Sequence, residues 1–150
     1  MNYFNPVKIV FGSLVRRQIA EECGGKSVLI ICSSTAYSRY NKDPELNALF
    51  SLGSVIFEHG FESNPSLTDI IEISHKYRES SLDFVVGLGG GSAMDVAKMA
   101  SVCIPAIKKG IHIDDLLNDS NLFSRFKEID CIQVPTTAGT GSEVTPFATV

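Results

Sequence analysis

The stretch FVVGLGGGSAMDVAKMASVCI, residues 84–104, decides the fold. It begins with Phe84–Leu88, an apolar run of strand length that is typical of a strand buried on both faces of a parallel sheet. Residues 89–92, Gly-Gly-Gly-Ser, follow at once and lead directly into a helical pattern. The apolar positions of that helix fall on one face, at Ala93, Val96, Ala97, Ala100 and Ile104. A strand that turns through glycines into a helix predicts one half of a βαβ unit.

Similar apolar runs elsewhere in the chain predict about five strands. Besides Phe84–Leu88 they are Lys8–Phe11, which we expect to be more exposed, Val28–Cys32, Ser54–Phe57 and Ile129–Val134. The run at residues 28–32 is continuous and β-branched, as in strands at the centre of a parallel sheet.

Helical patterns with start and stop signals lie between these strands. Ser13 predicts the cap of a helix that ends near Gly24, and Ser66 predicts the cap of a helix with apolar spacing up to Tyr77. Asp43 with Pro44 predicts a further helix that closes at Gly53. Strands that alternate with single helices predict an α/β fold with a doubly wound, mostly parallel, Rossmann-like sheet.

Composition excludes several classes of protein. A chain of 150 residues with 44% hydrophobic residues can bury the core of one domain. The formal charge of −4, without a basic run, argues against nucleic-acid binding. No stretch approaches the roughly 18 apolar residues of a membrane span. The four cysteines form no C-x-x-C pair and indicate reduced core residues of a cytoplasmic protein, namely Cys23, Cys32, Cys103 and Cys131.

Two segments stand apart from this pattern. Residues 108–127 are rich in Asp and Asn, and we expect them to form a mobile excursion. Residues 146–150 begin a new strand-like pattern at the end of the sequence, so we expect a domain truncated at its C-terminal end.

The glycine turn at residues 89–92 is suited to a phosphate. Backbone N–H groups and the positive end of a helix can approach an anion there, and three glycines exceed what a tight turn needs. Ser92 replaces the last small residue of the G-x-G-x-x-G/A fingerprint, and the turn follows a late strand, so a standard Rossmann assignment does not fit. A P-loop is excluded because no glycine at the required spacing precedes Lys-Ser or Lys-Thr.

A second loop, PTTAGTGSEVT at residues 135–145, follows the run that ends at Val134. It holds five hydroxyl side chains and two glycines, which suit the ribose and amide groups of a ligand. Hydroxyls alone generate no nucleophile without a base, so the loop is predicted to bind and not to react. The alternative is a solvated Ser/Thr-rich loop.

Residues 89–98, GGGSAMDVAK, and residues 135–145 resemble the paired signatures of the iron-containing alcohol dehydrogenase family. The order of the strands and the Asn-Pro-Ser sequence at residues 64–66 are also similar to that family. The resemblance covers essentially the whole chain and implies that residues 1–150 are a dinucleotide-binding domain. By the same resemblance, that domain would be the N-terminal part of a dehydroquinate-synthase-like fold, whose helical C-terminal domain we expect to be absent from this chain.

The resemblance also implies a set of cofactor-binding residues. Gly90, Gly91 and Ser92 would hold the pyrophosphate of NAD or NADP. The rest of the dinucleotide site would be lined by Asn64, Thr136, Thr137, Thr145 and Phe147. Asp95 and Lys98 stand three residues apart on a helix, and an i,i+3 ion pair is the preferred interpretation over ligand contact.

One departure from the family affects the choice of cofactor. Members that use NAD carry an aspartate at the end of the second strand, and the matching residue here is Ser33. A carboxylate repels a 2′-phosphate and a serine does not, so the sequence predicts tolerance of NADP(H).

The activity implied by the resemblance is hydride transfer from a primary or secondary alcohol to NAD(P), which yields an aldehyde or ketone. In the family an Fe²⁺ ion, or Zn²⁺, stabilises the alkoxide and is bound by one aspartate and three histidines of the C-terminal domain. Here His59, His75 and His112 are scattered, so we expect no metal ligand and no catalytic residue within residues 1–150. This portion alone is therefore predicted to be inactive. A homodimer joined through N-terminal strands is also implied.

Two alternatives stay open. One is a related enzyme of the dehydroquinate synthase or glycerol dehydrogenase type, acting on a phosphorylated sugar or polyol. The other is a dinucleotide-binding module without enzymatic activity. The sequence leaves open the physiological substrate, the metal, the oligomeric state and the choice between NAD and NADP.

Overall fold

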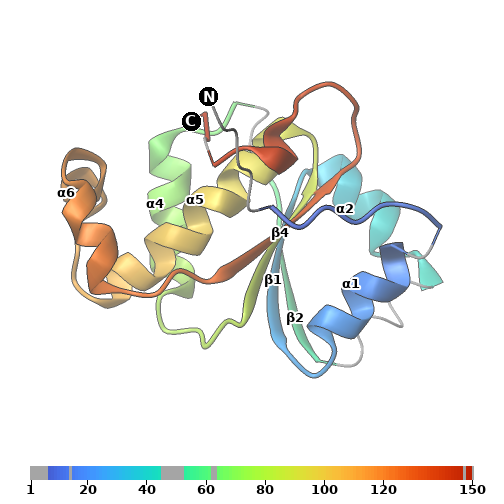
Figure 1. Cartoon of the computed structure of the whole chain (residues 1–150), viewed down its shortest axis with the longest axis horizontal. Coiled ribbons are helices and arrows are strands. Elements are labelled where there is room, and N and C mark those ends of the chain that lie inside the picture. The colour runs from blue at the N-terminus through green and yellow to red at the C-terminus, as the bar shows by residue number, and fades with distance from the viewer. Residues whose placement is uncertain (1–6, 14, 45–52, 62–63, 147, 150) are drawn as a thin grey trace, which may run out of the picture.

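The computed structural model describes residues 7–13, 15–44, 53–61, 64–146 and 148–149, and its framework is a four-stranded parallel sheet (Figure 1). The strands are β1 (Ser27–Cys32), β2 (Ser54–Glu58), β3 (Phe84–Gly89) and β4 (Asp130–Pro135). Their order across the sheet is β2-β1-β3-β4, and every neighbouring pair is parallel. The predicted parallel α/β sheet is confirmed.

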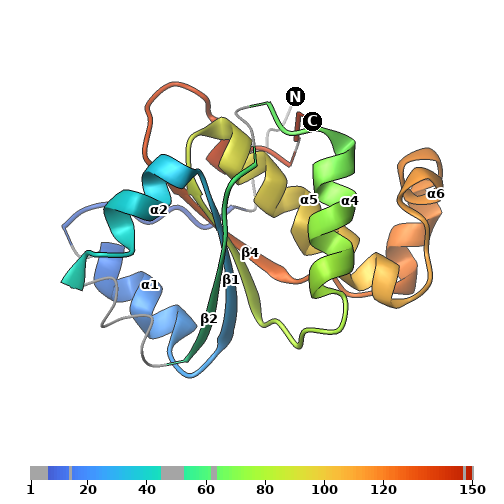
Figure 2. The ribbon, with the colours of Figure 1, turned by 180° about the vertical axis from the view of Figure 1, so that it is seen from behind.

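Helices cover both faces of this sheet (Figure 2). Helices α1 (Val15–Cys23) and α2 (Ser34–Tyr40) pack on one face, and α4 (Leu67–Tyr77) and α5 (Gly91–Lys108) pack on the other. The connection after β1 therefore passes over a different face from the connection after β3. This is the doubly wound arrangement that alternating strands and single helices predict.

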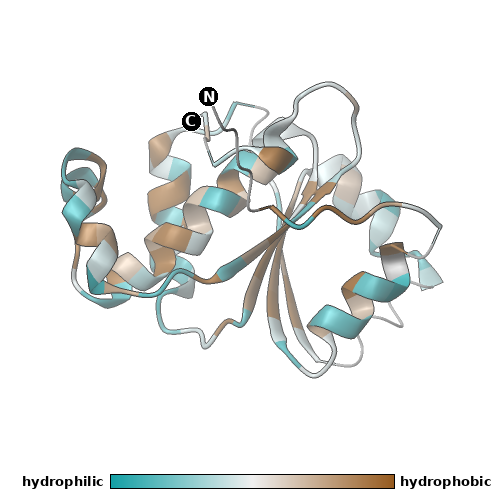
Figure 3. Ribbon diagram, in the orientation of Figure 1, coloured by the Kyte–Doolittle hydropathy of each residue, from teal (hydrophilic) through white to brown (hydrophobic). Residues whose placement is uncertain are grey.

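The core is built around β1, the strand with a neighbour on each side. Its residues from Val28 to Cys32 are completely buried because both faces are covered. Leu29 and Ile31 pack with α4 and α5, whereas Val28 and Ile30 pack toward α1 and α2. Figure 3 shows the result, with hydrophobic residues along the central strands and a mixture of hydrophilic and hydrophobic residues along the helices.

Helix α5 is attached to the start of β4 through a proline within the helix. Pro105 has no N–H, so the carbonyl of Ser101, four residues earlier, lacks its usual helical donor. The N–H of Ile129 donates to that carbonyl at 3.0 Å, just before β4 begins. The carbonyl that Pro105 leaves without a helical donor thus links α5 to the segment that leads into the edge strand β4.

Helix α4 begins where the sequence predicts it. Ser66 Oγ accepts from the N–H of Asp69, and the Asp69 carboxylate accepts from the N–H of Ser66, which forms a capping box. The hydrogen bonds to Ser66 lower the pKa of the Asp69 carboxyl. Local sequence signals are sufficient here because both partners lie within one turn.

Several predictions about elements are wrong. Residues 7–11 form no strand, and Phe11 is 91% exposed. No strand is present at residues 146, 148 and 149 either. The segment at residues 108–127 is not a plain excursion, because it contains α6 (Ile113–Asn118) and the 3-10 helix η1 (Ser120–Arg125).

The reasons for these differences are physical. Ile113 and Leu116 are buried and fix α6, but three apolar residues in a six-residue segment are too weak a helical signal in the sequence. Helix α2 was not predicted either, because Ser33 caps a short polar helix that resembles a loop in sequence. The helix predicted from Asp43 to Gly53 lies mostly outside the described residues.

The cysteines are free thiols. Cys23, Cys32 and Cys103 are buried, as predicted, and burial raises the pKa of Cys103 to about 12. Cys131 differs from the prediction because it lies on the edge strand β4 and is exposed. No helix among the described residues is long and apolar enough to cross a membrane.

We predict that Gly87→Ala destabilises the domain by about 2 kcal/mol, the usual cost of overpacking a core. A Cβ at Gly87 would lie 2.9 Å from the Ala97 Cβ and 3.0 Å from the Met94 Cα, so α5 would have to move. Urea unfolding followed by circular dichroism measures the effect. Gly91→Ala is the control, because a Cβ there meets only Thr140 atoms at 3.4 Å or more. Equal stability of the two variants would contradict the close packing of β3 and α5.

Candidate functional site

The carboxyl ends of β1 and β3 define a crevice at one edge of the sheet. These two strands are neighbours, but their chains continue to opposite faces, into α2 after β1 and α5 after β3. In open α/β sheets a ligand binds at such a point, because the diverging loops leave room above the strand ends. Ser33 follows β1 here, and the glycine turn at residues 89–92 follows β3.

The glycine turn joins β3 to α5 without a bulky side chain. Gly89 has φ 151°, which other residues rarely adopt, and a Cβ there would lie 3.0 Å from the Ala93 Cβ. Gly90 caps α5 and, as a glycine, supplies no side-chain oxygen to the first N–H groups of the helix. The positive end of an 18-residue helix therefore faces the crevice, where it favours an anion.

The hydroxyl-rich loop lies against this turn. The N–H of Thr136 donates to the Gly89 carbonyl at 2.8 Å, which continues the β3–β4 pairing into the loop. A Cβ at Gly90 would lie 3.2 Å from Thr137 Oγ1, so the loop approaches the turn as closely as glycine permits. Gly139 and Gly141 have φ of 103° and 65° and turn the chain back toward α5.

A partly buried polar cluster fastens the end of the loop to α5. The Lys98 ammonium lies 2.8 Å from Asp95 Oδ1 and donates to the Ser142 Oγ at 2.8 Å and to the Ser142 carbonyl at 3.1 Å. Ser142 in turn donates to Asp95 Oδ1 at 2.5 Å. The predicted ion pair is confirmed, and its side chains are only 14% and 13% exposed. The pair also binds Ser142 of the loop, and the i,i+3 spacing did not predict this contact.

The environment of Asp95 favours its charged form. Burial raises the pKa of this carboxyl, but hydrogen bonds from Lys98, Ser142 and the Thr149 N–H, together with the ammonium charge, more than offset that effect. The pKa therefore lies below its ordinary value of 3.8. Asp95 is an anchored carboxylate near neutral pH and is unsuited to act as a general acid.

A cavity of about 540 Å³ opens between α5, the loop and the start of α4. Four of the predicted cofactor-binding residues line it, namely Asn64, Gly91, Ser92 and Thr145. The other lining residues are Pro65, Asp95, Thr140, Ser142 and Thr149. Thr140 and Ser142 belong to the loop singled out in the sequence, although they were not proposed as ligand contacts.

The remaining predicted site residues lie beside this cavity or outside the described residues. Gly90 and Thr137 face each other at the turn, and Thr136 is held by the strand pairing. None of these three lines the cavity. Phe147 lies outside the part of the chain that the structure describes.

The described residues contain no group of three or more His, Cys, Asp or Glu side chains that could hold a metal ion. The three histidines lie on separate elements. His59 stacks on Tyr37, His75 lies on α4 near Arg78, and His112 precedes α6.

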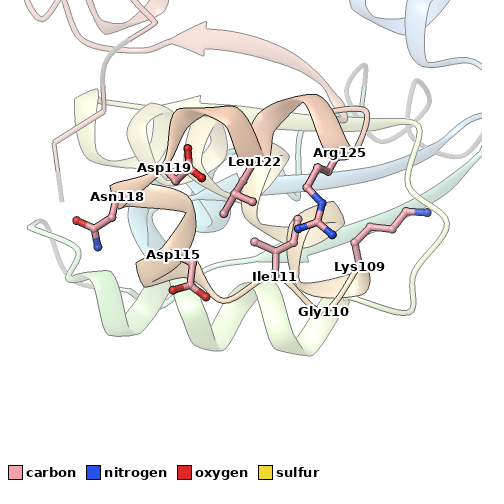
Figure 4. A pocket seen from close by; sticks show the side chains of 8 residues that line it. All are labelled: Lys109, Gly110, Ile111, Asp115, Asn118, Asp119, Leu122 and Arg125. Carbon is pink, nitrogen blue, oxygen red and sulfur yellow. The ribbon is translucent and has the colours of Figure 1, made fainter.

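A second cavity, of about 400 Å³, lies beside α6 (Figure 4). It is lined by Lys109, Gly110, Ile111, Asp115, Asn118, Asp119, Leu122 and Arg125. These residues connect the end of α5 to the start of β4, so the cavity lies at the amino edge of the sheet. It is therefore separate from the crevice at the carboxyl edge.

The chain belongs to the iron-containing alcohol dehydrogenase family, which matches residues 6–150. The Bacillus subtilis protein named "Probable NADH-dependent butanol dehydrogenase 2" is 30% identical over 154 residues, covering 99% of this chain and 38% of that protein. The crystal structure of the iron-containing alcohol dehydrogenase of Thermotoga maritima matches with a TM-score of 0.81 and 32% identity, covering 98% of this chain and 41% of that one.

A third relative is described with a dinucleotide. The structure of sulfoacetaldehyde reductase from Bifidobacterium kashiwanohense in complex with NAD+ has a TM-score of 0.68 and 30% identity. The match covers 96% of this chain and 38% of that one. The present chain thus spans about two fifths of the length of these relatives.

We predict that Asp95→Asn destabilises the domain by about 2 kcal/mol near neutral pH, because hydrogen bonds to a charged group are lost. The folded pKa of Asp95 lies below the unfolded value, so its contribution is present above pH 3.8 and is lost as pH falls through the folded pKa. Urea unfolding of wild type and variant should therefore converge in acid. The exposed Glu72→Gln is the control. A difference that stays constant into acid would contradict the charged role of Asp95.

Proposed function

We propose that this chain is the dinucleotide-binding part of an NAD(P)-dependent oxidoreductase that interconverts alcohols with aldehydes or ketones. The observation that carries the proposal is the convergence of the glycine turn, the positive end of α5 and the hydroxyl-rich loop at one crevice. The backbone N–H groups at the start of α5 suit a pyrophosphate, and the hydroxyl groups of the loop suit the riboses on either side of it. Membership of the iron-containing alcohol dehydrogenase family supports the reaction class.

The residues present fit a dinucleotide. Gly90, Gly91 and Ser92 would hold the pyrophosphate, because a side chain at Gly90 would fill the space beside Thr137. Asn64 and Thr145 line the adjoining cavity, and Thr136, Thr137 and Phe147 complete the proposed set. The nicotinamide, when bound, accepts a hydride from the alcohol carbon. The chain's own contribution is to orient the dinucleotide through backbone groups and hydroxyls.

Both NAD(H) and NADP(H) are proposed as cofactors. Ser33 Oγ accepts from the N–H of Ala36 at 3.2 Å and serves as the N-cap of α2. It provides no negative charge at the end of β1, so a 2′-phosphate meets no carboxylate at this position.

The described residues do not fit the metal of the family, because they bring no cluster of ligands together. We propose that Fe²⁺ or Zn²⁺ and the alcohol are bound by a helical C-terminal domain, where the proton of the alcohol is also removed. No catalytic step is assigned to side chains within residues 1–150.

A homodimer is proposed for the same protein. Residues 7–11 present Ile9 and Phe11 to solvent with exposures of 64% and 91%. An extended apolar segment of this kind is suited to cover the same segment of a second copy.

We predict that Gly91→Val lowers the affinity for NADH and for NADPH by at least about tenfold, because a branched side chain occupies the space needed for backbone approach to phosphate. Titration of the cofactor's fluorescence measures both affinities. Gly91→Ala is the graded control, since its Cβ makes ordinary contacts with Thr140. Unchanged affinity in a folded Val variant would remove the pyrophosphate assignment.

We further predict that the 150-residue chain oxidises no alcohol, even with NAD(P)⁺ and added Fe²⁺ or Zn²⁺. Cofactor binding positions one reactant only, and the described residues provide no cluster of three or more ligands for a metal that would lower the pKa of an alcohol. The assay follows NAD(P)H formation from a panel of small alcohols. A longer protein that includes the helical domain should be active and sensitive to a chelator. Metal-dependent turnover by the 150-residue chain would contradict the proposal that the helical domain binds the metal and the alcohol.

A further inference from the structure

Two aromatic rings stack at the carboxyl edge of the sheet, away from the glycine turn. Tyr37 of α2 and His59, which follows β2, have ring centroids 3.9 Å apart and an interplanar angle of 19°. Phe57 packs against Tyr37 edge-on at 5.4 Å. Tyr37 and Phe57 are partly buried against the core, whereas His59 is exposed. The phenol ring is therefore anchored, and it presents the imidazole to solvent.

The stacked pair lies at the same edge of the sheet as Ser33. The N–H of Tyr37 donates to the Ser33 carbonyl at 2.8 Å in the first turn of α2. Strands β1 and β2 run parallel with Ile31 opposite Glu58, which brings His59 level with the end of β1. Figure 2 shows α2 beside the upper ends of β1 and β2. The backbone of His59 thus lies next to the end of β1, which Ser33 follows, because neighbouring strands are about 5 Å apart.

The charged groups around this corner are few. Glu58 turns to the other face of the sheet, where it accepts from Lys76 and Tyr77 at 2.6 Å. From β1, Cys32 stays a neutral thiol, because burial raises its pKa to about 11. From α2, Arg39 is exposed in the last turn. Neither Glu58 nor Cys32 therefore places a free negative charge beside Ser33.

We propose that His59 is a specificity-determining residue of the dinucleotide site, where it contacts the 2′ substituent of the adenosine ribose, and that Tyr37 positions its ring. The inference rests on the proposed dinucleotide function. A neutral imidazole can exchange one hydrogen bond with a 2′-hydroxyl, and an imidazolium also attracts a 2′-phosphate. Protonation of the ring would therefore increase the preference for NADPH over NADH.

The test titrates NADH and NADPH with wild type and His59→Gln at about pH 6 and about pH 8. The 2′-phosphate itself takes up a proton near pH 6, so the variant measures that background. Relative to the variant, the affinity ratio of NADPH to NADH in wild type should rise about two- to fivefold in acid, as expected for an exposed ion pair. Circular dichroism verifies folding, and His59→Asn is a second variant with the same expected result.

Two further variants separate the roles of the neighbours. Tyr37→Phe preserves the stack and should keep the pH response, whereas Tyr37→Leu removes the stack and should lose it. Arg39→Ala is the control, because a guanidinium keeps its charge at both pH values. It should leave the pH response unchanged even if NADPH affinity falls.

The outcomes distinguish this inference from the proposed function. An identical pH response in wild type and both His59 variants would overturn the role of His59 while dinucleotide binding stands. Failure of wild type to bind either cofactor would overturn the proposed function and this inference together.

Discussion

Helix α5 lies so close to strand β3 that a Cβ at Gly87 would meet the Cβ of Ala97 at 2.9 Å and the backbone of Met94 at 3.0 Å. This contact holds the helix against β3, and the N-terminus of the helix lies at the carboxyl end of that strand. The same helix holds the chain just before β4 and the loop that follows this strand. Ser101 accepts the N–H of Ile129 before the strand, and Asp95 with Lys98 holds Ser142 after it. The crevice is therefore shaped by one helix and by the glycine that lets it approach.

The electrostatics of the crevice follow from this arrangement. The chain carries a formal charge of −4, so its overall field does not attract an anionic dinucleotide. Asp95 is paired with Lys98, and hydroxyls supply much of the remaining polar lining. Attraction for phosphate must then come from the N-terminal dipole and backbone N–H groups of α5, which act over short distances. A site built in this way orients a cofactor and leaves acid–base chemistry to other groups.

Sequence reasoning succeeded where the signal is local and strong. Four apolar runs became strands within a residue or two, and Ser66 capped α4 as predicted. It failed where stability depends on a distant neighbour. Residues 7–11 are apolar enough for a strand, yet they pair with no described strand. Helix α6 has only a few apolar residues, and its Leu116 is buried with Ile111 and Ala106.

The features of the candidate site divide in the same way, into local patterns that the sequence predicts and contacts that depend on the fold. The sequence by itself determined the glycine turn, the hydroxyl-rich loop and the Asp95–Lys98 pair, because each is a short pattern whose chemistry follows from residue type and spacing. Only the tertiary structure decided that this pair fastens the loop through Ser142, and that His59 stacks on Tyr37 beside Ser33. These contacts join residues from 22 to 47 positions apart. Their distances depend on strand order and helix packing, which no local pattern encodes.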